Sequence, residues 1–307
     1  MATFSEYEEL CARLRTAHNS ASAEQLSKFL RLVRELRIRD SEATAKYGGQ
    51  LLSSYRSMLS EEELWLVHEQ VAVAAMDIGS TDQAAALVRA IAKRFPDSNR
   101  MRRLKGMWWE AQGQHSQAEQ IYKDILDNQP SNELALKRLV ALEKSRGRLP
   151  EAVEALKAYL DVFSNDREGW EELGELYLEM LLYRQALFCY EELLMHAPGN
   201  LAYLIRYADL LYTLGGNGHL KLARSYYSKA VELSAGTNMR ALWGVMMCSA
   251  NVTDKVSLQD SRTRAQIELP ELAARAVLKE YKTHAPNKVA VATVVLEAAL
   301  PKTSGGS

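Results

Sequence analysis

An alanine that returns every 34 residues constrains the fold of this chain more than any other feature. The alanines are Ala84, Ala118, Ala152 and Ala186. A proline stands 12 residues after three of them, at Pro96, Pro130 and Pro198. A fixed period of this size is typical of repeat proteins, in which each repeat is one small unit of secondary structure that stacks on the next. We therefore expect an array of repeats rather than a single closed core.

Within one period, the apolar residues follow the spacing of two amphipathic helices. The best example runs through Trp170, Leu173, Gly174, Tyr177, Leu182, Ala186, Tyr190 and Leu193. Small residues at Gly174 and Ala186 allow two helices to approach closely, and Pro198 cannot continue a helix. Each period is therefore predicted to be an antiparallel helical hairpin, and the chain to be all-α.

These positions resemble the tetratricopeptide repeat. Its family pattern of Trp, Leu, Gly, Tyr, Ala, aromatic and Pro is matched by Trp170, Leu173, Gly174, Tyr177, Ala186, Tyr190 and Pro198. Other periods keep parts of the pattern, at Ala84, Pro96, Gly106, Ala118, Pro130, Ala152 and Ala223. The resemblance implies a superhelical solenoid of antiparallel helix pairs, with the first helix of each pair facing a concave groove.

The period also predicts the domain organisation. Five repeats are expected, at residues 65–98, 99–132, 133–166, 167–200 and 201–237. The last is longer because Ala223 lies 37 residues after Ala186, and the inserted residues are expected in the turn at residues 215–218. Residues 1–64 should form an N-terminal helical cap, 238–300 a degenerate C-terminal hairpin in which Pro270 interrupts a helical pattern, and 301–307 a frayed tail.

Composition narrows the function classes. The chain has 38 Lys and Arg against 39 Asp and Glu, so its net charge of -1 provides no general attraction to nucleic acid or anionic membranes. Three widely separated cysteines, Cys11, Cys189 and Cys248, favour a reducing compartment. The most apolar stretch, residues 289–300, is shorter than the roughly 20 residues of a membrane-spanning helix. We expect no secretory signal and no membrane span.

No motif carries catalysis, a metal or a cofactor. The patterns H-E-x-x-H, G-x-S-x-G and the phosphate-binding loop are missing from the sequence. The glycine-rich residues 215–218 are better explained as a turn between helices than as a phosphate site. His68 lies inside a helical pattern and is given no role. The chain is predicted not to be an enzyme.

Candidate binding residues come from the expected first helices, which would line the groove. Four glutamates follow one helical face, at Glu168, Glu171, Glu175 and Glu179, and basic residues lie on earlier first helices, at Lys137, Lys144, Arg100 and Arg103. Two explanations stay open for the glutamates: they pair with neighbours or with solvent, or they hold a basic partner segment. The basic residues near Trp108 and Trp109 favour a solvated face or an acidic protein partner over nucleic acid.

Several stretches resemble a more specific family. They are Arg94-Phe-Pro-Asp-Ser-Asn-Arg-Met-Arg-Arg-Leu-Lys-Gly-Met107, Gly169-Trp-Glu-Glu-Leu-Gly-Glu-Leu-Tyr177, Ala186-Leu-Phe-Cys-Tyr-Glu-Glu-Leu193, Tyr212-Thr-Leu-Gly-Gly216 and Asn238-Met-Arg-Ala-Leu-Trp-Gly244. Together they are similar to the family of subunit 2 of the endoplasmic reticulum (ER) membrane protein complex, over residues 62–250.

This resemblance implies a non-catalytic scaffold that is peripheral on the cytoplasmic face of the ER membrane. The complex inserts transmembrane helices, including tail anchors, and its subunit 2 would hold the cytosolic parts of membrane subunits 3 and 5 and connect them to soluble subunit 8 or 9. The resemblance therefore implies a hetero-oligomeric assembly and no cofactor. The alternative is a free cytosolic tetratricopeptide adaptor or co-chaperone, but Glu168 and Glu172 have the wrong sign for the family clamp that holds chaperone tails.

Overall fold

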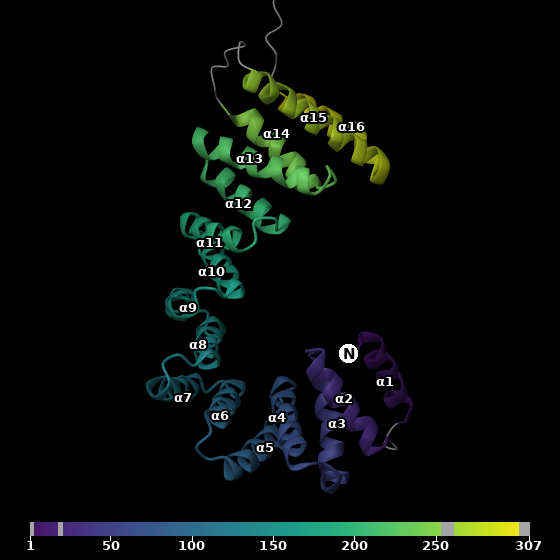
Figure 1. Ribbon diagram of the computed structural model, residues 1–307, viewed down its shortest axis with the longest axis vertical. Coiled ribbons are helices and arrows are strands. Elements are labelled where there is room, and N and C mark those ends of the chain that lie inside the picture. The colour runs from purple at the N-terminus through teal and green to yellow at the C-terminus, as the bar shows by residue number, and fades with distance from the viewer. Residues whose placement is uncertain (1–2, 18–20, 253–260, 301–307) are drawn as a thin grey trace, which may run out of the picture. The chain divides into compact units, whose positions relative to one another are not determined.

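The computed structural model describes residues 3–17, 21–252 and 261–300, and the expected tail at 301–307 lies outside these residues. Within the described part all regular structure is helical, and the predicted all-α class is confirmed. Figure 1 shows the helices following one another in chain order. The chain separates into two compact units, residues 1–155 and 156–307, which meet within one helix, α9. Each unit is described by itself.

Antiparallel pairs make up most of both units. In the first unit, α1 (Phe4–Ala17), α2 (Ala23–Glu35) and α3 (Ser41–Ser54) precede α4 (Glu61–Asp77), α5 (Thr81–Arg94), α6 (Asn99–Ala111), α7 (His115–Asn128), α8 (Glu133–Ser145) and the start of α9 (Leu149–Val162). The second unit contains α10 (Arg167–Glu179), α11 (Tyr183–His196), α12 (Leu201–Leu214), α13 (Asn217–Leu233), α14 (Met239–Asn251), α15 (Ser261–His284) and α16 (Val289–Ala299).

The first helix of a pair begins after a capping residue that also recurs with the 34-residue period. These N-cap residues are Ser98, Asn132, Asp166 and Asn200. The side chain of Asn132 accepts a hydrogen bond from Ala135 N, and that of Asn200 accepts from Ala202 N and Tyr203 N. Such bonds satisfy amides that have no partner in the first turn, so they fix where α8, α10 and α12 start, whereas Ser98 makes no side-chain capping bond.

The first helix also ends at a periodic position. The residue there has a positive φ, at Gly79, Gly113, Gly147, Leu181 and Gly215. Four are glycine, which adopts this left-handed conformation without the steric cost that a side chain brings. Leu181, with φ of 59°, is the exception and bears that cost.

Three local features differ from the sequence expectation. The inserted residues lengthen a helix, because only Gly215 and Gly216 form the turn and α13 begins at Asn217. Pro270 does not break its helix, because α15 runs through it from Ser261 to His284. α4 begins at Glu61, inside the range expected for the cap, since Ser60 caps it by accepting a bond from Glu63 N.

The periodic alanines lie where the two helices of a pair touch. All five, Ala84, Ala118, Ala152, Ala186 and Ala223, are fully buried. The glycines of the pattern serve the same packing, because a Cβ on Gly106 would come within 2.5 Å of the ring of Tyr122. Small side chains at these positions let the helix axes approach closely.

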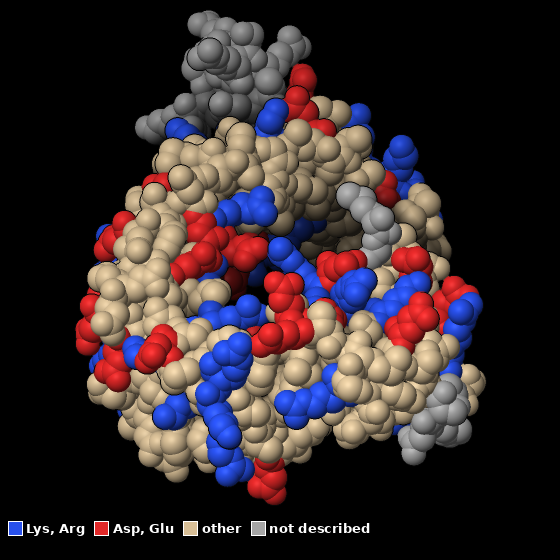
Figure 2. Space-filling view, turned by 60° about the horizontal axis from the view of Figure 1, so that its bottom comes forward, with Lys and Arg blue, Asp and Glu red and all other residues tan. Residues whose placement is uncertain are grey.

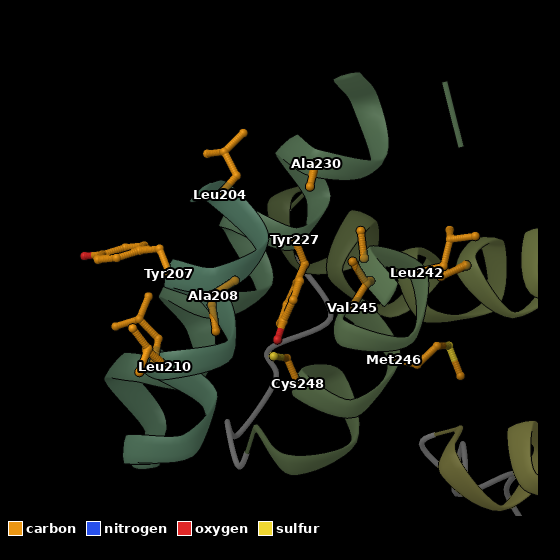
Figure 3. Packing of buried hydrophobic residues seen from close by; sticks show 14 of the residues in the cluster. Leu204, Tyr207, Ala208, Leu210, Tyr227, Ala230, Leu242, Val245, Met246 and Cys248 are labelled. Atoms are coloured by element: carbon orange, nitrogen blue, oxygen red, sulfur yellow. The ribbon is translucent and has the colours of Figure 1, made fainter. Parts of the chain in front are cut away.

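A continuous apolar cluster holds the second unit together. Figure 3 shows Tyr227 of α13 reaching between α12, which carries Ala208, and α14, which carries Val245 and Cys248. Each of these side chains is at most 4% exposed. One aromatic ring therefore contacts both the first helix of its own pair and the first helix of the next pair, which is how a stack of hairpins shares one core.

Candidate partner-binding face

The eight predicted binding residues lie on three first helices. Arg100 and Arg103 are on α6, Lys137 and Lys144 on α8, and Glu168, Glu171, Glu175 and Glu179 on α10. The first two helices belong to the first unit and α10 to the second. On the face drawn in Figure 2, Lys and Arg are interspersed with Asp and Glu, which agrees with the balanced charge of the sequence.

On α6, the two arginines share one carboxylate of α4. Arg100 Nε lies 2.5 Å from Glu69 Oε2, whereas Arg103 Nη2 is 3.9 Å from the other oxygen, Glu69 Oε1. The Arg100 side chain is 59% exposed and that of Arg103 only 21%. Arg100 is therefore an exposed, paired charge, and Arg103 is a more buried charge at a longer distance from its counter-ion.

Further along α6, Glu110 joins three helices. Its Oε1 accepts a hydrogen bond from the hydroxyl of Tyr122 on α7 at 2.5 Å, and both its oxygens face the guanidinium of Arg138 on α8. Burial, together with the charge of Glu110, raises the pKa of Tyr122, so this hydroxyl remains a donor at physiological pH. The part-buried bond from Tyr122 lies within the α6–α7 hairpin, and the pairing of Glu110 with Arg138 connects this hairpin to the next.

The glutamate row on α10 divides into two kinds of residue. Glu171 Oε2 accepts a bond from the Tyr203 hydroxyl at 3.0 Å, and Glu175 Oε1 accepts one from Tyr190 at 2.7 Å and lies 3.6 Å from Arg206 Nη2. Among the residues that the structure describes, the exposed carboxylates of Glu168 and Glu179 have no hydrogen bond or ion pair.

The basic residues expected on α8 also have neighbours within their own unit. Lys137 Nζ lies 3.1 Å from Glu133 Oε1, one turn earlier on the same helix. Lys144 is exposed in the last turn of α8, where a positive charge is favoured by the helix dipole. A role of either lysine in partner binding stays a prediction.

A recurring motif, which sequence reasoning missed, explains much of this chemistry. A tyrosine of a second helix donates to a carboxylate of its own first helix, and the same carboxylate faces an arginine of the next first helix. The three examples are Tyr122, Glu110 and Arg138; Tyr190, Glu175 and Arg206; and Tyr227, Asp209 and Arg240. The periodic tyrosine was visible in the sequence, but its acceptor is not at a fixed spacing.

Two hollows lie beside these pairs in the first unit. One, of 690 Å³, is lined by residues of α4 and α6 that include Trp65, Glu69, Arg100 and Met101, and by Ile91 and Arg94 of α5. The other, of 540 Å³, is lined by apolar residues together with charged ones that include Arg39, Asp77, Glu110 and Arg138. In each hollow, acidic and basic side chains lie next to one another.

The described residues provide no metal site and no membrane-spanning helix. No group of three His, Cys, Asp or Glu within residues 3–17, 21–252 and 261–300 could hold a metal ion. None of the helices in those ranges has the length and apolarity needed to cross a bilayer. The three cysteines are buried and unpaired, and burial raises the pKa of Cys189 and of Cys248 to about 12, so neither forms a reactive thiolate at neutral pH.

Comparison with solved structures supports the fold. The chain resembles the crystal structure of the C-terminal part of a TPR repeat-containing protein from Cytophaga hutchinsonii, with a TM-score of 0.53 and 15% identity. The match covers 87% of this chain and 98% of the other. At this identity the similarity establishes tetratricopeptide architecture only.

Sequence comparison is more specific. Residues 87–233 match the family described as the EMC2 TPR-like repeat domain. The chain is 36% identical to "ER membrane protein complex subunit 2-A" of Xenopus laevis, over 84% of this chain and 86% of the relative. It is 33% identical to "ER membrane protein complex subunit 2" of Dictyostelium discoideum, over 84% and 83% respectively. The resemblance seen in the sequence is thus confirmed, and the chain belongs to the family of subunit 2 of the ER membrane protein complex.

Proposed function

We propose that this chain is a non-catalytic scaffold subunit of an ER membrane protein complex, peripheral on the cytoplasmic face. It would hold cytosolic tails and loops of membrane subunits, such as subunits 3 and 5, and connect them to soluble subunit 8 or 9. In this position it would support insertion of transmembrane helices, including tail anchors, by other subunits. The proposal rests on family membership across most of the chain and on the surface of the first helices.

The observation that supports the scaffold role is that some glutamates of α10 bond to other helices of the chain, whereas others are exposed and, within the described residues, unpaired. Glu171 and Glu175 connect helices within the chain, whereas Glu168 and Glu179 on the same helix are exposed and have no counterpart among the described residues. Stacked hairpins that are bonded to one another and carry exposed, unpaired charges can bind an extended partner segment, because they hold the segment in place without any catalytic step.

The experiment is a fractionation of cells that express the tagged full chain. The membrane pellet is divided between alkaline carbonate and mild detergent, and the detergent extract is separated by size-exclusion chromatography and identified by mass spectrometry. We expect carbonate to release the chain and detergent to preserve its co-elution with several multi-spanning ER proteins. A soluble monomer, alone or with chaperones, would instead support the adaptor alternative.

Variants locate the surface. Glu168→Lys with Glu179→Lys should reduce co-elution of at least one partner. It should leave the fold intact at a cost below about 1 kcal/mol, because neither carboxylate has a hydrogen bond or ion pair among the described residues and only Glu168 gains from the helix dipole. Asp127→Lys with Glu151→Lys, on exposed positions of second helices, is the matched charge control and should leave co-elution intact. Glu171 and Glu175 are unsuitable for this test, because changing them also removes bonds to Tyr203 and Tyr190.

A further inference from the structure

Arg103 on α6 has a guanidinium whose hydrogen-bonding capacity is unused. Among the residues that the structure describes, it makes no hydrogen bond, and its nearest carboxylate oxygen is Glu69 Oε1 at 3.9 Å. The side chain is nevertheless only 21% exposed. Burial lowers the pKa of Arg103, and the charge of Glu69 offsets this only in part. A guanidinium has five N–H donors, and leaving them unmet in a partly buried place is costly.

The counter-ion near Arg103 is already engaged. Glu69 Oε2 lies 2.5 Å from Arg100 Nε, so one carboxylate faces two arginines and the trio has a net charge of +1. The neighbouring Arg138 is neutralised by Glu110. The rest of α6 adds to the excess, because the helix carries four basic residues and a single acidic one. An additional carboxylate would complete the local charge balance.

The surroundings indicate what else the bound segment contains. The hollow between α4 and α6, which α5 also lines, has apolar lining residues that include Trp65, Met101 and Leu104. Its charged lining residues are Glu61, Glu62, Glu69, Arg94 and Arg100, of which Arg94 pairs with Glu61 and Arg100 with Glu69. Arg103 does not line the hollow itself, but it faces Glu69, which does, so a segment that places a carboxylate beside Arg103 can place an adjacent aliphatic side chain in the hollow. Carboxylate is the group favoured by the geometry of the site, since the planar guanidinium matches its two oxygens and the chain already uses that pairing between Arg138 and Glu110.

We propose that Arg103 is the docking point for an acidic side chain of a partner protein segment, with a neighbouring apolar side chain held in the hollow between α4 and α6. The inference deepens the proposed function and rests on it only for the source of the segment, which would be another subunit of the complex. It concerns the first unit alone, and it assigns Arg103 a binding role rather than a structural one.

The test measures binding of a peptide to the purified full chain by fluorescence polarisation. The probe is a short fluorescein-labelled peptide in which Glu and Leu alternate with Ser, and its matched copy has Gln in place of every Glu. We expect the Glu peptide to bind and the Gln copy to bind at least about tenfold more weakly, because a charge-assisted hydrogen bond is lost. Equal binding of the two peptides would refute a carboxylate-specific site.

Variants separate docking from general electrostatics. Arg103→Met, which keeps the apolar stem, should weaken binding of the Glu peptide about tenfold or more, and Arg103→Lys should weaken it less because the charge remains. Lys105→Gln is the matched control: it removes the same charge from an exposed position of α6 and should change binding less than about twofold. A similar loss in Lys105→Gln and Arg103→Met would overturn the assignment.

Thermal unfolding shows whether Arg103 is structural. Arg103→Met should keep or raise the thermal midpoint, since it removes a buried charge that lacks a hydrogen bond. A lowered midpoint would show that the arginine supports the fold and would overturn the inference. Inorganic phosphate that displaces the peptide better than glutarate does would also overturn it, in favour of a phosphate-bearing ligand. A further outcome is that the wild-type chain fails to bind the Glu peptide while Arg103→Met still co-elutes with its partners from cells. That result would refute this inference and leave the proposed function standing.

Discussion

Gly106 and Gly174 occupy the same position of the repeat, two periods apart, yet we expect alanine to destabilise the protein at Gly106 and to be nearly neutral at Gly174. A Cβ at Gly106 would lie 2.5 Å from Tyr122 Cε1 and 2.8 Å from its hydroxyl oxygen. At Gly174 the nearest atom is Tyr190 Cε2, at 3.1 Å. The difference lies in how deeply each tyrosine reaches toward the first helix of its pair.

The expected magnitude follows from two opposing terms. Replacing glycine by alanine inside a helix contributes about 1 kcal/mol of stability at either position. At Gly106 the new methyl group overlaps a fully buried ring whose hydroxyl is bonded to Glu110, so the ring cannot move aside, and overpacking costs about 3 kcal/mol. The net change for Gly106→Ala is about 2 kcal/mol of destabilisation. For Gly174→Ala a small adjustment suffices, and the two terms cancel to within about 0.5 kcal/mol.

Hydrogen exchange followed by mass spectrometry measures both variants, because peptides from α6–α7 and from α10–α11 report the opening of each pair separately. A double-mutant cycle with Tyr122→Leu isolates the clash: in that background Gly106→Ala should become neutral or stabilising. Equal effects of Gly106→Ala and Gly174→Ala, or no coupling to Tyr122, would refute the packing argument.

Three further results follow from the structure, each measurable by the same exchange experiment. Leu181→Gly should stabilise α10–α11 by about 0.5–1 kcal/mol, because it relieves a left-handed conformation at a side chain that is 67% exposed; a loss of protection would contradict this. Glu110→Gln should lower the free energy of unfolding by about 1–3 kcal/mol, because Tyr122 and Arg138 lose a charged partner. A change under about 0.5 kcal/mol would show that the tyrosine–carboxylate–arginine motif does not stabilise the fold. Burial lowers the pKa of His68 from its usual 6.5, so on acidification the unfolded chain takes up a proton at this residue before the folded chain does, and the stability should fall as the pH drops below 6.5. His68→Gln should flatten this part of the stability-versus-pH profile. An unchanged profile would show that His68 is not the residue responsible.

Much of the fold was predictable because its signals are local. The buried alanines, the N-cap residues and the left-handed glycines each recur with the same period, and each acts within a turn or within one pair of helices. The last two series were present in the sequence and would have located the helix ends more accurately. The site was less predictable: the acidic row on α10 was found, but its division into bonded Glu175 and exposed Glu179 was not, because Tyr190 and Arg206 reach Glu175 only after packing.

The helix pairs, the repeat class and the family can be recognised from the amino-acid sequence, since they depend on spacing along the chain and on motifs shared with relatives. Which charged side chains pair with one another within the protein becomes visible only when the helices are packed. Arg100 and Arg103 look alike in the sequence, three residues apart on one helix, yet Arg100 engages Glu69 closely and leaves Arg103 without a hydrogen bond among the described residues. The reason is physical: helix formation follows local backbone preferences, whereas the pairing of charges depends on distances set when successive hairpins stack.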